Sequence, residues 1–94
     1  MSNNYRDAPD PVTLWLIEDN AAFRSNLSET LNSIDHIQCS RDFSSCEEAL
    51  ESLQQCIEKP QAVLVDLSLP GMSGIDGLKQ ILAISADIKC LVLT

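Results

Sequence analysis

The sequence is poor in basic residues, and it contains no long apolar run. Six Lys and Arg residues stand against fourteen Asp and Glu residues, which gives a formal net charge of -8. Because so acidic a chain repels a phosphate backbone, we do not expect it to bind nucleic acid by itself. The longest apolar runs, LWLI and AVLV, are far too short to cross a membrane, so no bilayer-spanning segment is expected.

Cysteines are few and are not spaced like metal ligands or like a disulfide framework. We expect them to be small, reduced core residues. The N-terminal stretch MSNNYRDAPDP lacks the basic start and the apolar segment of a secretory signal. The sequence therefore predicts a cytoplasmic protein with a flexible leader over residues 1–11. The cysteines are Cys39, Cys46, Cys56 and Cys90.

Apolar segments with strand character alternate with segments of helical periodicity along the whole chain, whose 94 residues suffice for one domain. Strands are predicted over residues 12–17, 36–40, 62–65 and 88–93. A helix is predicted over about 21–33 after Asn20, a second from the Ser45 cap to Lys59-Pro60, and a third after Ser73.

Each predicted helix carries an apolar stripe that we expect to face a sheet. The stripes consist of Phe23, Leu27, Leu31 and Ile34, of Cys46, Leu50, Leu53 and Ile57, and of Ile75, Leu78 and Leu82. Strands that alternate with helices of this length predict right-handed βαβ units. The expected fold class is therefore α/β, with a parallel sheet and helices on both of its faces.

Acidic side chains stand where two of the predicted strands end. Glu18 and Asp19 follow the first strand, and Asp66 follows the strand over residues 62–65. Ligands of an open parallel sheet bind beyond the carboxyl ends of its strands, where the strand order reverses. Three carboxylates gathered there would repel one another, and a hard cation such as Mg²⁺ would relieve that conflict. The pattern therefore predicts a Mg²⁺ site that could accept a phosphoryl group.

Three stretches, LWLIEDN, VLVDLSLPGMSGIDGL and the closing LVLT, together resemble the receiver domain of bacterial two-component response regulators. The resemblance covers residues 12–94. It implies a flavodoxin-like or CheY-like fold that takes a phosphoryl group from a histidine kinase or a phosphotransfer protein. It implies a signalling domain rather than an enzyme.

The resemblance also implies a role for each matching position. Asp66 would be the phosphoacceptor, Asp19 a direct Mg²⁺ ligand, and Glu18 a ligand acting mainly through water. The backbone carbonyl of Ser68 would be the remaining protein ligand. Thr94 would hydrogen-bond the phosphoryl group.

The chain departs from the family pattern in its last part. Receiver domains have a fifth strand ending in a Lys that contacts the phosphoryl group, whereas this sequence stops after the fourth predicted strand, so we expect a partial receiver domain over residues 12–94. Lys59, Lys79 and Lys89 are not expected to reach the site. Mg²⁺ affinity with impaired phosphorylation is therefore expected. The apolar strand over residues 88–93 would be an unpaired sheet edge, which predicts a homodimer.

Other functions would require residues that this sequence lacks or leaves unmatched. A nucleoside triphosphatase would need a G-x-x-x-x-G-K-[ST] loop, and a dinucleotide site would need G-x-G-x-x-G. A haloacid-dehalogenase-type phosphatase would need a second Asp where Ser68 stands. A degenerate receiver that only dimerises or blocks a partner, without phosphorylation, stays open. The run NAAFRSNL resembles receivers joined to helix-turn-helix output domains, so a full-length protein could carry a DNA-binding domain.

Overall fold

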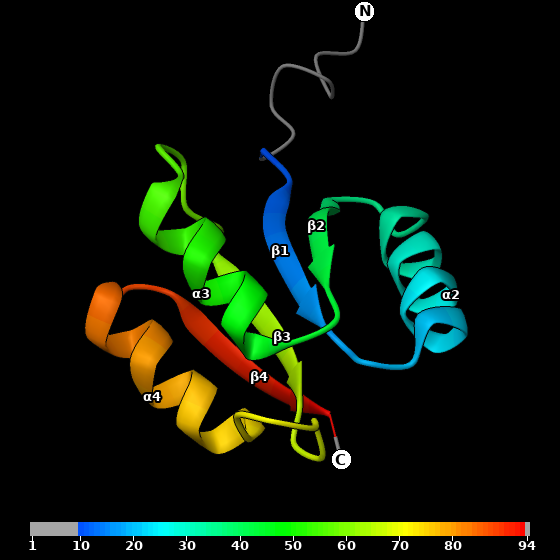
Figure 1. Cartoon of the computed structure of the whole chain (residues 1–94). Helices are drawn as coiled ribbons and strands as arrows, with labels where there is room; N and C mark the ends of the chain where they lie inside the picture. Colours follow the sequence, from blue (N-terminus) through cyan, green and yellow to red (C-terminus); the bar gives the residue numbers. More distant parts are fainter. Residues whose placement is uncertain (1–9, 94) are drawn as a thin grey trace, which may run out of the picture.

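A four-stranded sheet organises the protein, seen in a computed structural model that describes residues 10–93 (Figure 1). All of its strands are parallel, in the order β2-β1-β3-β4. The chain places β2 on one side of β1 and β3 on the other, so the strand order reverses between β1 and β3. The strands are β1 Val12–Ile17, β2 Ile37–Phe43, β3 Ala62–Asp66 and β4 Lys89–Leu93.

Helices cover both faces of the sheet, which confirms the predicted α/β fold. Helix α2 (Ala21–Asn32) lies on one face, and α3 (Cys46–Gln55) and α4 (Gly74–Ile84) lie together on the other (Figure 1). Alternate residues of β1 divide between the two faces, as a strand covered on both sides requires. Trp15 and Ile17 pack in the larger cluster with α3 and α4, whereas Leu14 and Leu16 pack in a smaller cluster beneath α2.

The three predicted helix caps are confirmed. The side chains of Asn20, Ser45 and Ser73 each accept a hydrogen bond from a backbone N–H in the first turn of the helix that follows. These caps satisfy donors that have no partner inside the helix. Each cap therefore fixes where a helix begins after the preceding strand and its loop.

The predicted apolar stripes of the helices were correct only in part. Helix α2 has no buried residue, and Phe23 and Ile34 are 49% and 46% exposed. Only Leu27 and Leu31 of that stripe pack against the core, because the small cluster beneath α2 offers little surface to cover. Helical periodicity locates the apolar side of a helix, but the neighbouring elements decide how much of it is buried.

Helices α3 and α4 differ from prediction in their ends or their orientation. Helix α3 ends at Gln55, because Cys56 adopts an extended backbone, and Ile57 beyond it is 98% exposed. In α4 the buried residues are Gly74, Gly77 and Ile81, whereas the predicted Ile75 and Leu82 are exposed. The two glycines allow α4 to lie close to its neighbours, because a Cβ at Gly77 would meet the Cys46 side chain and one at Gly74 would meet the Asp66 backbone.

Strand β2 is an edge strand, as predicted, but it extends to Phe43. Its pairing with β1 shifts by one residue, so that Leu14 pairs with Cys39 and Trp15 pairs with Arg41. The extra residue moves the odd-numbered residues of β2 to the other face, so that Cys39 packs in the cluster beneath α2 and Phe43 packs in the cluster with α3. Arg41 consequently lies over the rings of Trp15 and Phe43.

Candidate functional site

Three carboxylates from separate segments meet at the carboxyl edge of the sheet. Glu18 and Asp19 lie in the loop between β1 and α2, and Asp66 is the last residue of β3. One oxygen of each carboxylate lies within 4.8 Å of one oxygen of the other two. Since β1 and β3 are the neighbours between which the strand order reverses, the residues lie at the position where such sheets bind ligands.

The three carboxylates differ in burial. Glu18 is only 5% exposed, Asp66 is partly buried and Asp19 is exposed. Burial raises the pKa of the Glu18 carboxyl above its usual value, and the neighbouring Asp19 and Asp66 act in the same direction. The Asn20 N–H donates to Oε2 of Glu18 at 3.0 Å and opposes that rise. The site therefore concentrates negative charge at a cost that a cation would reduce.

Ser68 holds one carboxylate oxygen of Asp66. The backbone N–H and the hydroxyl of Ser68 both donate to Oδ1 of Asp66, each at 3.0 Å. Ser68 therefore orients the carboxylate and supplies no second acidic group, which a phosphatase of the haloacid-dehalogenase type would need at this position.

The oxygen ligands of this site fit a hard divalent cation. Mg²⁺ prefers carboxylate and carbonyl oxygens, keeps several of its waters and needs only one or two carboxylates from a protein. The partly exposed setting leaves room for those waters, and the close carboxylates supply the charge. Soft ligands do not contribute, since no cysteine or histidine belongs to this group of described residues.

The loop from β3 to α4 is tied to the neighbouring helix. Gly71 has a φ of +72°, a left-handed conformation that glycine adopts without strain. The next residue, Met72, donates its backbone N–H to Oε2 of Glu47 in α3 at 3.3 Å. The loop after Pro70 thus has a specific partner, and α3 fixes one side of the loop beside Asp66.

The remaining residues singled out from the sequence lie elsewhere. Thr94 and the leader residues 1–9 are outside the described part of the chain. Lys59 and Lys89 line a cavity of about 470 Å³ with Val12 and Ala62, the first residues of β1 and β3, so they lie at the opposite edge of the sheet. Lys79 is exposed on α4. Among the described residues, no lysine lies beside the three carboxylates.

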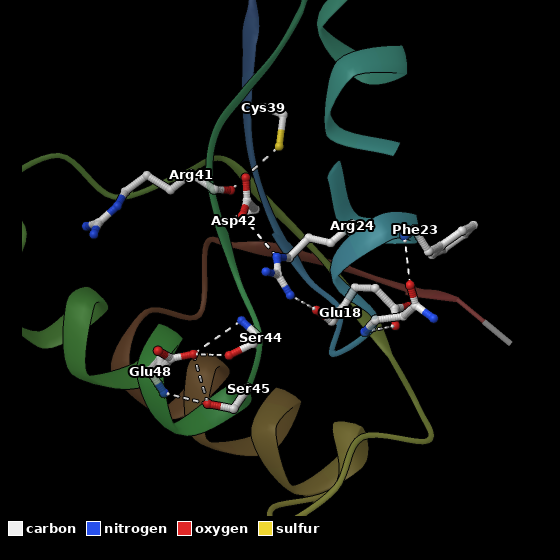
Figure 2. A network of polar contacts seen from close by, with 10 residues as sticks. Glu18, Phe23, Arg24, Cys39, Arg41, Asp42, Ser44, Ser45 and Glu48 are labelled. Carbon is white, nitrogen blue, oxygen red and sulfur yellow. Dashed lines mark hydrogen bonds and ion pairs between the residues drawn. The ribbon is translucent and has the colours of Figure 1, made fainter. Parts of the chain in front are cut away.

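Sequence reasoning missed one residue that contacts this loop. Arg24 of α2 donates from Nη1 to the backbone carbonyl of Glu18 at 2.8 Å, and its Nε lies 3.2 Å from Oδ1 of Asp42 (Figure 2). The available signal was a lone basic residue in the first helix, one turn after the acidic pair. Its partner in β2 could not be read from that signal.

Comparison with known proteins agrees with this geometry. A model of the response regulator receiver domain matches residues 14–94. The chain belongs to the response regulator receiver family. The match includes all three carboxylates and ends at the last residue of the chain.

Curated relatives are similar over most of this chain. The response regulator GacA of Pseudomonas viridiflava is 28% identical over 83 residues, which are 88% of this chain and 38% of that protein. A nitrate/nitrite response regulator protein homolog of Haemophilus influenzae is 29% identical over 85 residues, 90% of this chain and 40% of that protein. The chain thus spans about two fifths of the length of these relatives.

Solved structures share the fold. A response regulator receiver protein from Pseudomonas putida superposes with a TM-score of 0.76 at 26% identity, covering 92% of this chain and 69% of that one. The response regulator domain of Thermotoga maritima CheB gives a TM-score of 0.76 at 20% identity, covering 87% of this chain and 59% of that one. The second likeness shows the fold alone. Together they confirm the CheY-like architecture predicted from the sequence.

Proposed function

We propose that this chain is a phosphoacceptor module that takes a phosphoryl group from a histidine kinase or a phosphotransfer protein onto Asp66. The observation that carries the proposal is the meeting of Glu18, Asp19 and Asp66 at the strand-order reversal of a receiver-family sheet. Asp19 and Asp66, with the Ser68 carbonyl, would hold Mg²⁺ directly, and Glu18 would act through water. When bound, the cation supplies positive charge that neutralises the phosphoryl oxygens.

The residues of the chain suit an in-line transfer. Ser68 holds Oδ1 of Asp66, so we assign the attack to the other oxygen, Oδ2. The P–O bond to Asp66 forms as the P–N bond of the donor phosphohistidine breaks, and the histidine nitrogen leaves with the electron pair. A carboxylate is an established nucleophile in reactions that form an acyl phosphate. Thr94 would hydrogen-bond the transferred group.

We expect slow or unstable phosphorylation of the 94-residue chain itself. Lys59 and Lys89 lie at the opposite edge of the sheet and Lys79 is exposed on α4, and no ion pair between a described lysine and the three carboxylates is present, so we expect no second fixed cation for the phosphoryl charge. Mg²⁺ binding depends on the carboxylates, so we expect it to be retained.

A cytoplasmic location agrees with a kinase partner and with four free cysteines.

Incubation with acetyl phosphate and Mg²⁺, followed by intact mass measurement, tests the proposal. We expect incomplete incorporation of one phosphoryl group that requires both Mg²⁺ and Asp66. The variant Asp66→Asn should not be labelled, whereas Asp87→Asn, the same change at the opposite edge of the sheet, should behave as the wild type. Equal labelling of Asp66→Asn would refute the assignment. Rapid, complete labelling would refute the expected impairment.

A second candidate function is a dimerisation or blocking module that works without phosphorylation. The exposed apolar residues Leu91 and Val92 of β4 favour it, since they are 51% and 42% exposed. Mg²⁺ binding without any labelling, together with self-association, would support this alternative over the phosphoacceptor. The chain covers about two fifths of its curated relatives, and no DNA-binding output is assigned to the described residues.

A further inference from the structure

Arg24 joins the acidic loop to the edge strand β2. Its guanidinium donates to the Glu18 carbonyl at 2.8 Å through Nη1 and pairs with Asp42 at 3.2 Å through Nε (Figure 2). The Arg24 side chain is 22% exposed, so the pair is partly shielded from water. A guanidinium holds two acceptors in a fixed planar arrangement, which a flexible ammonium group does not reproduce.

The Glu18 backbone is fixed at both of its polar atoms. Its N–H donates to the Phe43 carbonyl at 2.9 Å, and its carbonyl accepts from Arg24. The orientation of that carbonyl sets the plane of the peptide that leads into Asp19. This peptide group joins Glu18 to Asp19, so two of the three carboxylates are attached on either side of it. Fixing this peptide therefore reduces the freedom of both side chains.

We propose that Arg24 is a positioning residue for Mg²⁺ binding, one that holds the Glu18-Asp19 peptide so that both carboxylates face Asp66. The inference rests on the proposed function, since it concerns the same site. Arg24 touches neither the cation nor the phosphoryl group in this role. It acts through the backbone that carries two of the carboxylates, as residues behind metal ligands do in other proteins.

Electrostatics alone predicts the opposite effect of removing Arg24. Loss of a positive charge near an acidic site makes the site more negative and should strengthen Mg²⁺ binding. Loss of a positioning contact leaves the loop freer and should weaken it. The direction of the change in affinity therefore separates the two roles, which a change in stability would not do.

Mg²⁺ titration calorimetry on the whole chain tests the inference with three variants. Arg24→Ala should weaken binding on the order of 10-fold. Arg24→Lys keeps the charge but not the planar pair of donors, so it should weaken binding as well. Arg41→Ala is the matched control, because it removes the same charge from a residue that lies over the Trp15 and Phe43 rings. The control should bind as tightly as the wild type or slightly more tightly.

Hydrogen exchange of the metal-free protein gives a second readout. The Asn20 amide donates to Glu18, so we expect it to exchange faster in Arg24→Ala than in Arg41→Ala. Circular dichroism checks that each variant is folded. If Arg24→Ala does not fold, the comparison uses Arg24→Lys instead.

The outcomes are distinct. Unchanged or tighter Mg²⁺ binding by the Arg24 variants, with normal binding by the wild type, overturns the inference and leaves the proposed function intact. Failure of the wild type to bind Mg²⁺ overturns both. Weaker binding by Arg41→Ala, equal to that of Arg24→Ala, also overturns the inference, because it would show that binding weakens without loss of the contact to the Glu18 carbonyl.

Discussion

Gly74 lies directly against the backbone of Asp66. A Cβ atom added at Gly74 would stand 2.5 Å from the Asp66 carbonyl oxygen and 2.9 Å from Cα of Leu67. Backbone atoms at such distances cannot move aside as the end of a side chain can. The first residue of α4 must therefore be a glycine for β3 to end where Asp66 is needed.

Gly74→Ala should destabilise the protein and weaken Mg²⁺ binding together. We expect a loss of about 2 kcal/mol or more in the free energy of unfolding, measured by urea denaturation, because strain replaces a close contact. Ala83→Gly, at an exposed position of the same helix, is the control. It should cost about 1 kcal/mol through helix propensity and leave the Mg²⁺ affinity unchanged. An unaltered affinity in Gly74→Ala would show that Asp66 does not depend on this contact.

The substitution Asp66→Asn should change the stability of the protein in opposite directions, relative to the wild type, in the absence and in the presence of Mg²⁺. Without the metal, removing one of three crowded negative charges should leave the protein as stable as the wild type, or more stable by about 1 kcal/mol. With Mg²⁺ at about 100 times its dissociation constant, the wild type should gain about 2.7 kcal/mol and the variant much less. Thermal unfolding with EDTA and with Mg²⁺ measures both. Asp87→Asn should retain the full gain, and a full gain in Asp66→Asn would contradict the assigned site.

Ser44 controls the pKa of Glu48 at the start of α3. The Ser44 hydroxyl and N–H both donate to Oε1 of Glu48 and lower the pKa of that carboxyl. A lowered pKa gives stability that is present above the unfolded-state value of 4.5 and is lost as the pH falls through the folded value. Ser44→Ala should raise the pKa of Glu48, as measured by NMR titration of its carboxyl carbon.

Ser45→Ala is the matched control for that titration. It removes the cap hydrogen bond to the Glu48 N–H at 3.2 Å and should cost about 1 kcal/mol of stability. Its effect on the pKa of Glu48 should be smaller, because Ser45 contributes less to the shift than Ser44. A larger pKa change in Ser45→Ala than in Ser44→Ala would reverse this assignment.

Self-association is expected at the outer edge of β4. Leu91 and Val92 lie on this edge strand and are 51% and 42% exposed, and within residues 10–93 no further strand pairs with β4. Sedimentation velocity should show a dimer whose fraction rises with protein concentration. Leu91→Lys should favour the monomer, whereas Ile57→Lys, at a fully accessible position outside the sheet, should not. A monomer at every concentration would refute the expected dimer.

Much of the fold was predictable because local signals agreed with one another. The strand and helix order and the three helix caps followed from apolar periodicity and from Asn20, Ser45 and Ser73. The helix surfaces were less predictable. Ile57 continues the helical spacing but lies outside α3, and Phe23 lies on a helix that has little core to cover.

The sequence by itself determined that carboxylates stand at the ends of two buried strands. An apolar run predicts a buried strand, so acidic residues that directly follow it, here Glu18-Asp19 and Asp66, lie at the carboxyl end of that strand. The tertiary structure alone decided that Arg24 of α2 would reach both Glu18 and Asp42, and that Gly74 would lie against Asp66. Arg24 joins the loop before its own helix to strand β2, and Gly74 packs against the strand end that precedes its loop. Their geometry depends on how strands and helices pack, which no local pattern of residues specifies.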